Sequence, residues 1–189
     1  MEEKHEDLRV TKTHSAIRKA LSDMICEMNY EEISVKELCA RAMINRKTFY
    51  LHYESLDALL EELQEEIADK FISRKISYKS LADIKSIIRV YFETTANMPK
   101  LHERLLCSGS YQRVGDAISR RIMEHRRKEN KDAFGLDEAR ESLVFSYFAM
   151  NSGNLYRQWV ADGKKLSVED LIEMATKLIC YGMSSVVVG

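Results

Sequence analysis

The stretch "ISVKELCARAMINRKTFYLHYESLDALL", residues 33–60, contains three helix-forming segments, each preceded by a residue that can cap it. Ser34, Asn45 and Ser55 each stand just before an apolar-periodic run, where a side-chain oxygen can accept from the free N–H groups of a helix start. We therefore expect helices over residues 35–41, 46–53 and 56 to about 75. Only "AMI", residues 42–44, separates the first two, which predicts a helix-turn-helix unit.

The rest of the chain is also predicted to be helical. Among its 189 residues the first glycine is Gly109 and the one proline is Pro99, whereas sheets need tight turns that usually contain these residues. Apolar residues at three-four spacing predict further helices over residues 11–28, 81–97, a short one from Pro99, 110–131, 136–161 and 167 to about 187. The expected fold class is all-α, with about nine helices: a three-helix domain at residues 9–54 and a larger helical domain at 55–189.

The segment 46–53 has two chemically different faces. Phe49 and Tyr53 are four residues apart and share a face with Ile44, so this face should pack against the preceding helices. Arg46 and Lys47 point elsewhere and place two cations at a helix N-terminus, where the helix dipole disfavours positive charge. That placement indicates an external anion, although an exposed helix with two cations can also be a plain packing element.

DNA is the anion that fits this chemistry. Arg46 and Lys47, at the start of a recognition helix, can reach base edges, while hydroxyl and imidazole groups and the first backbone N–H groups of both helices can donate to phosphates. Lys36, on the preceding helix, is a further phosphate contact or an ordinary solvated lysine. The predicted DNA-contacting residues are Ser34, Lys36, Asn45, Arg46, Lys47, Thr48, Tyr50 and His52.

Residues 33–60 resemble the DNA-binding domain of the TetR family of bacterial transcriptional regulators, and the likeness extends over roughly residues 9–65. The matching features are the capping Ser34, the turn "AMI", and "FYLHY" at the end of the recognition helix. Two positions depart from the family pattern. Met43 replaces the usual turn glycine, at a cost of about 1 kcal/mol if the backbone there is left-handed, and Leu56 replaces a lysine that contacts phosphate.

The resemblance implies a repressor that binds double-stranded operator DNA as a homodimer, formed through the last two helices, and is released from the DNA by a small-molecule effector. Small residues on those helices would allow close packing: Ser146, Ala149, Gly153, Ala175 and Gly182. The alternative is a regulator or activator of the same fold that answers to a protein partner. Candidate effector-binding residues in the second domain are Phe92, His102, Tyr111, Tyr147, Met150, Asn151 and Trp159.

Other classes of protein find little support in the sequence. There is no nucleophile elbow, phosphate loop or recognisable acid–base pair, so an enzyme is not expected. The four cysteines are far apart and lack zinc-ligand spacing, so we expect reduced thiols and neither a metal nor a cofactor.

The charged start "MEEKHEDLRV" is not a signal peptide and no apolar run could span a bilayer, which favours a cytoplasmic protein. With 29 basic and 30 acidic residues, DNA binding must rest on a local patch.

Overall fold

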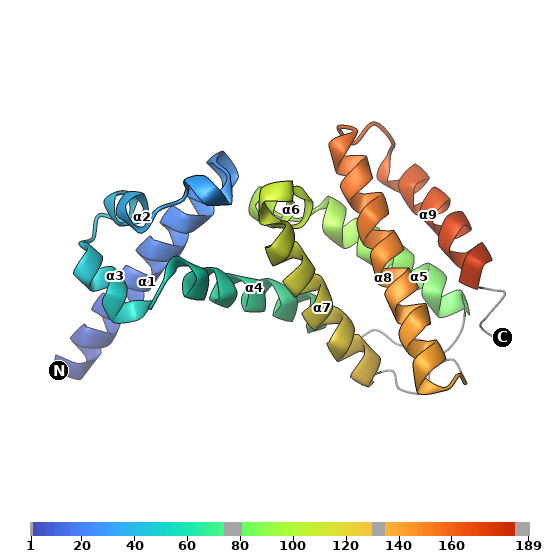
Figure 1. Cartoon of the computed structure of the whole chain (residues 1–189), viewed down its shortest axis with the longest axis horizontal. Coiled ribbons are helices and arrows are strands. Elements are labelled where there is room, and N and C mark those ends of the chain that lie inside the picture. Colours follow the sequence, from blue (N-terminus) through green and yellow to red (C-terminus); the bar gives the residue numbers. More distant parts are fainter. Residues whose placement is uncertain (1, 74–80, 130–134, 184–189) are drawn as a thin grey trace. The chain divides into compact units, whose positions relative to one another are not determined.

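A computed structural model describes residues 2–73, 81–129 and 135–183 and confirms the all-α fold class. Nine α-helices and two short 3-10 helices lie within these residues (Figure 1). The α-helices are α1 (Glu2–Glu27), α2 (Val35–Arg41), α3 (Arg46–His52), α4 (Leu56–Ile72), α5 (Leu81–Ala96), α6 (Lys100–Cys107), α7 (Gln112–Glu129), α8 (Glu138–Ala161) and α9 (Val168–Met183). The predicted ends of α4 at 75, α7 at 131 and α9 at 187 lie outside the described residues.

The chain forms two units. The first contains residues 1–66 and 100–114, and the second contains residues 67–99 and 115–189. The sequence predicts a domain boundary after residue 54. In the structure α6 groups with the N-terminal helices, and α4 and α7 each contribute residues to both units.

The first unit has its core between α1, α2, α3 and the start of α4. Ile17, Met24 and Ile25 on α1 are fully buried, as are Leu38 on α2 and Phe49 on α3. The helix α1 begins at Glu2, nine residues before the predicted start, and Thr13 Oγ1 donates to the Arg9 carbonyl 2.9 Å away as it would within a helix. The added turns are mostly polar, so they give no apolar stripe that could have predicted them.

The segment around α6 is tied to α1 by polar contacts. Arg104 Nε donates to the Ile25 carbonyl at 2.6 Å, and the Tyr111 hydroxyl donates to the Met28 carbonyl at 3.0 Å. Burial raises the pKa of Tyr111 to about 12, so its hydroxyl remains a donor. These bonds satisfy carbonyls at the end of α1 that have no partner within the helix.

The second unit is built largely on α5, α8 and α9, which pack on one another. Phe92 on α5, Tyr156 on α8 and Ala175 on α9 are almost completely buried, and the Tyr156 hydroxyl donates to the Thr95 carbonyl at 2.8 Å. Arg89 on α5 forms an ion pair with Glu169 on α9 at 2.6 Å. In the part of the chain that the structure describes, none of the helices combines the length and apolarity needed to cross a bilayer.

The turn between α2 and α3 has the geometry of a Schellman motif. Ile44 N donates to the Cys39 carbonyl at 3.0 Å and Met43 N to the Ala40 carbonyl at 3.2 Å, while Met43 has a φ of 53°. The left-handed conformation expected from the family pattern is therefore present, in a residue with a Cβ. The same motif ends α8, where Gly163 occupies the equivalent position with a φ of 74°.

Met43→Gly is expected to raise the free energy of unfolding by about 1 kcal/mol, because a non-glycine residue in the left-handed region costs roughly 1–2 kcal/mol and glycine returns part of this as unfolded-chain entropy. Gly163→Ala is the matched control at the other turn and should lower stability by about the same amount. Urea unfolding of both variants measures the effect. A Met43→Gly protein no more stable than the natural one would show that the turn is unstrained.

Candidate DNA-binding surface and effector site

Two side-chain caps fix where α2 and α3 begin. Ser34 Oγ accepts from Glu37 N at 3.2 Å, and Asn45 Oδ1 accepts from Thr48 N at 2.7 Å. The Thr48 hydroxyl also donates to Asn45 Oδ1, at 3.0 Å. Asn45 and Thr48 therefore bond to each other. The backbone N–H groups at the start of α3 that Asn45 does not cap remain available to a ligand.

The predicted two-faced character of α3 is confirmed. Phe49 is fully buried and Tyr53 is 6% exposed, whereas Arg46 and Lys47 are exposed, as are Tyr50 at 56% and Leu51 at 74%. The first turn of α3 contains no acidic residue. Its exposed face thus places two cations beside the positive end of the helix dipole, without a local carboxylate to balance them.

His52, at the end of α3, lies in a small aromatic cluster. Its ring meets that of His14 edge-on with centroids 4.6 Å apart, and His14 Nδ1 is hydrogen-bonded to the Tyr53 hydroxyl at 2.9 Å. Burial, with a smaller contribution from His14, lowers the pKa of His52 below its usual value. This shift favours the neutral imidazole, which can still donate an N–H to a phosphate.

The two remaining candidate positions flank the recognition helix. Lys36 is exposed on the first turn of α2, and Leu56 is half-buried as the first residue of α4. Ser55 caps α4 by accepting from Ala58 N at 3.1 Å. The first turn of α4 thus has a defined start, but lacks the cation that the family pattern places there.

Leu56→Lys is expected to tighten DNA binding and to steepen the dependence of log K on log salt by about one unit per subunit, because each phosphate contact releases one counterion. The added cation at a helix start should cost about 0.3–1 kcal/mol of stability. Binding titrations at several salt concentrations measure the slope, with Leu166→Lys, which adds the same charge at an exposed leucine of the second unit, as a control for net charge. An unchanged slope would place the start of α4 away from the phosphates.

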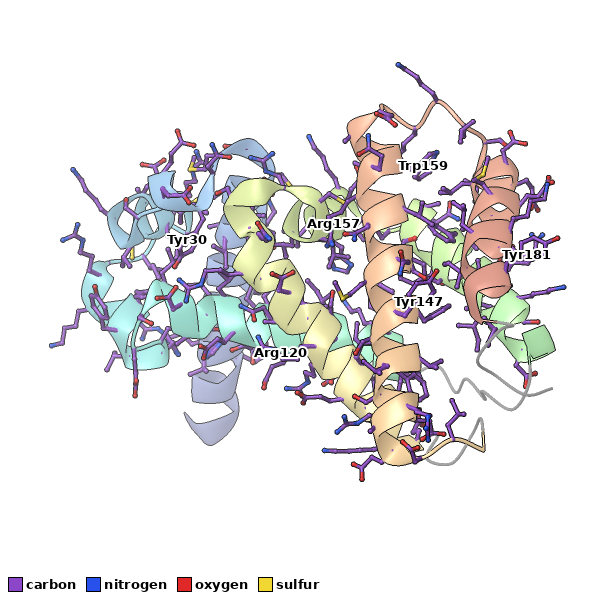
Figure 2. The ribbon with its side chains drawn as sticks, turned by 45° about the vertical axis from the view of Figure 1, so that its right-hand side comes forward. Tyr30, Arg120, Tyr147, Arg157, Trp159 and Tyr181 are labelled. Carbon is purple, nitrogen blue, oxygen red and sulfur yellow. The ribbon has the colours of Figure 1, made fainter. Side chains whose placement is uncertain are left out.

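The second unit contains an open groove of about 400 Å³ between α7 and α8. Its lining includes Asp116, Ser119, Arg120, Met123, Glu124, Arg127, Ser142, Phe145, Ser146, Ala149, Met150, Gly153 and Arg157. Figure 2 shows Arg120 on α7 and Arg157 on α8, the two helices that border this groove.

A smaller cavity of about 120 Å³ lies among α4, α5, α7 and α8. Its lining is mostly apolar, with Arg126 and Ser152 as buried polar members, 3% and 1% exposed. Arg126 Nη1 contacts Glu129 at 2.8 Å and Nη2 donates to the Phe71 carbonyl at 2.6 Å. The remaining lining residues are Phe71, Ile87, Val90, Tyr91, Thr94, Ser119, Ile122, Met123, Phe148, Ala149 and Gly153.

The seven predicted effector residues are spread over several environments. Met150, 64% exposed, lines the groove, and none of the other six lines either space. His102 and Tyr111 belong to the first unit, while Phe92 is fully buried in the core of the second. Asn151 Nδ2 donates to the Tyr147 carbonyl at 2.7 Å and Trp159 Nε1 to the Leu166 carbonyl at 2.9 Å. Tyr147, labelled on α8 in Figure 2, is exposed to solvent.

Sequence reasoning missed the polar residues that do line the cavity. Arg126 lies in the run "HRRKE", which is typical of a solvated helix end, and Ser152 directly follows Asn151, the polar candidate chosen from the sequence. The usable signal was Ser152 itself, a polar residue spaced four from both Phe148 and Tyr156 on the buried face of α8.

Comparison with known proteins supports the structural description. No family model matches the chain. Over 106 residues it is 30% identical to the uncharacterised HTH-type transcriptional regulator YxbF of Bacillus subtilis, an alignment that covers 53% of this chain and 28% of YxbF. The chain thus spans little more than a quarter of the curated relative it matches.

Solved structures resemble it over nearly its whole length. NalD, the secondary repressor of the MexAB-OprM efflux pump in Pseudomonas aeruginosa, has a TM-score of 0.69 at 16% identity and covers 94% of this chain and 97% of its own. FadR from B. subtilis in complex with stearoyl-CoA gives 0.58 at 17% identity, with 89% and 98% covered. A TetR family transcription regulator from Marinobacter aquaeolei gives 0.56 at 15%, with 92% and 96% covered. The chain therefore has the fold of the TetR family of transcriptional regulators, with a helix-turn-helix in its N-terminal unit.

Proposed function

We propose that this protein is a TetR-family transcriptional regulator that binds double-stranded operator DNA as a homodimer and is released from it by a small-molecule effector. The observation that carries the DNA half of the proposal is the exposed face of α3, with Arg46, Lys47 and Tyr50 outward and no acidic residue in its first turn. A helix that only packed would gain from a carboxylate at this end. Arg46 and Lys47 are the candidates for base contacts, and Tyr50, His52 and Lys36 for phosphate contacts.

Exposed apolar side chains on α8 and α9 support the homodimer. Leu143, Tyr147 and Met150 recur at four- and three-residue spacing on α8, as do Met174, Leu178 and Tyr181 on α9, and all six are between 41% and 78% exposed. Figure 2 labels Tyr147 on α8 and Tyr181 on α9. Apolar stripes on two neighbouring helices suit a four-helix interface with a second copy. The small residues proposed from sequence are placed differently, since Ala175 is fully buried and Ala149 and Gly153 line the cavity and the groove.

The effector half of the proposal is supported by the groove and the cavity in the second unit. A cavity with buried polar groups favours a small ligand over a purely protein-controlled regulator. FadR, a structural neighbour, is described with stearoyl-CoA bound, and NalD is described as a repressor. A ligand that binds better to one conformation of the dimer would shift its population away from the DNA-binding state. The exposed apolar stripes on α8 and α9 also favour a second candidate function, a regulator controlled by a protein partner, because such a partner could cover these stripes in place of a second copy of the chain.

Binding of the purified protein to the DNA upstream of its own gene, compared with a scrambled duplex at two salt concentrations, tests the proposal. We expect tighter binding to the natural duplex, which weakens as salt rises because phosphate contacts release counterions. Equal, weak binding to both duplexes would remove the DNA half for this operator candidate, and selection from random duplexes then settles whether any sequence is preferred.

A further inference from the structure

Ser152 gives the inner cavity an unused hydrogen-bonding group. Its side chain is 1% exposed, and its Oγ has no hydrogen-bond partner among the described residues. A buried polar atom left without a partner costs about 1–3 kcal/mol, so such groups in proteins usually meet water or a ligand. Phe148 and Tyr91 contribute apolar surface to the same cavity. The cavity thus suits a small apolar group that carries or adjoins one polar atom.

The cavity and the groove border each other along α7 and α8. Ser119, Met123, Ala149 and Gly153 line both spaces. A Cβ built on Gly153 would meet only the guanidinium of Arg157, at 3.8 and 3.9 Å. Gly153 therefore places no side chain between the two spaces, and the flexible Met123 can move aside. One ligand can occupy both.

The groove adds positive charge to this combined site. Arg120, Arg127 and Arg157 line it, against Asp116 and Glu124, which leaves one net positive charge in its lining (three minus two). Arg157 Nη2 donates to Asn154 Oδ1 at 2.7 Å, which holds this side chain in place. Guanidinium groups present planar sets of donors that match the oxygens of carboxylates and phosphates.

We propose that the effector is an amphipathic organic anion, with its apolar group in the cavity beside Ser152 and its carboxylate or phosphate in the groove near Arg120 and Arg157. This inference rests on the proposed function, because it names the chemical class of the effector. The cavity of about 120 Å³ is slightly smaller than a cavity of about 150 Å³ that accepts benzene, so the enclosed apolar group has on the order of six carbon atoms. Any larger part of the ligand would lie in the open groove.

Calorimetric titration of the full-length protein with four hexyl compounds tests this assignment. Hexanoate and hexyl phosphate should both bind, hexanol should bind at least about tenfold more weakly, and hexylamine should not bind, because only the anions pair with the arginines. Comparing the affinities for hexanoate and hexyl phosphate shows whether the site prefers a carboxylate or a phosphate.

Three substitutions locate the site. Arg157→Gln should weaken hexanoate binding about tenfold while leaving hexanol binding unchanged. Gly153→Leu should abolish binding, since the new side chain enters the space shared by cavity and groove. Gly153→Ala, which adds only a methyl group, should weaken binding less, and both residues favour a helix more than glycine does. Arg121→Gln is the matched control, because Arg121 is an exposed α7 arginine that pairs with Asp69 at 3.4 Å and lines neither space. Thermal unfolding confirms that each variant folds.

Three results would overturn the inference: no binding of either anion, hexanol binding as tightly as hexanoate, or hexanoate affinity unchanged in both Arg157→Gln and Gly153→Leu. DNA binding measured on the same preparation without any hexyl compound separates this inference from the proposed function. Specific DNA binding with no binding of the anions overturns only the ligand class. Anion binding without specific DNA binding supports the site and contradicts the proposed regulator.

Discussion

Leu178→Glu is expected to convert the dimer to monomers and to weaken operator binding by at least about 100-fold. Leu178 is 54% exposed on α9, between Met174 and Tyr181 in the apolar stripe. In a two-fold interface each substitution enters twice, and each buried unpaired carboxylate costs several kcal/mol. A monomer would then carry one recognition helix, which halves the contacts and removes the fixed spacing between half-sites.

Sedimentation equilibrium and DNA titration of this variant measure the two effects together. Leu166→Glu is the matched control, since Leu166 is a similarly exposed leucine, 49% exposed, in the connection between α8 and α9 and outside the stripe. It should remain dimeric. A dimeric Leu178→Glu protein with natural DNA affinity would show that the α8 and α9 stripes are not the interface between the copies, and would favour a protein partner there.

Arg46→Ala is expected to relax sequence preference by about 1–3 kcal/mol at one base pair in each half-site. Arg46 is the first residue of α3 and is exposed, while Phe49 on the opposite face of the same helix is fully buried. An arginine in this position can donate two parallel bonds to a guanine, and alanine leaves that base unread. In a two-fold dimer the loss occurs twice, so affinity for the best operator should fall more than affinity for random DNA.

Titration of a set of single-base operator variants measures this preference. Lys19→Ala, which removes an exposed α1 cation paired with Asp23 at 3.2 Å, is the control for loss of positive charge. If Arg46→Ala lowers affinity for all duplexes equally, Arg46 contacts the backbone and Lys47 becomes the candidate base reader.

The helix-turn-helix was predictable because its signals are local. Ser34 and Asn45 predict the helix starts, because each caps a backbone N–H three residues further on. The four-residue spacing of Phe49 and Tyr53 predicts the buried face. The left-handed turn at Met43 was expected only through family resemblance, since methionine itself gives no such signal. The first turns of α1 were missed for the complementary reason: their sequence, "EEKHEDLRV", contains no apolar stripe.

The second unit was less predictable because its cavity depends on how distant segments pack. Arg126 is buried where the Phe71 carbonyl and Glu129 accept hydrogen bonds from its guanidinium, and the residue spacing in α7 does not predict this arrangement. Trp159 and Asn151 were reasonable effector candidates by composition, yet their polar atoms bond to backbone carbonyls near in sequence. Ser152 is recognisable as a cavity residue only from the packed structure, because its buried Oγ is then seen to have no hydrogen-bond partner among the described residues.

Selection of bound duplexes from a random pool by the purified full-length protein tests the central claim most directly. We predict an enriched inverted repeat whose two half-sites are separated by about one helical turn, 10–10.5 base pairs, or a multiple of it, because two recognition helices related by a two-fold axis read the same major-groove sequence. The Arg46→Ala protein should enrich a repeat that is degenerate at one position in each half. A pool that shows no enriched sequence after selection with the natural protein would contradict the assignment of α3 as a DNA-reading helix.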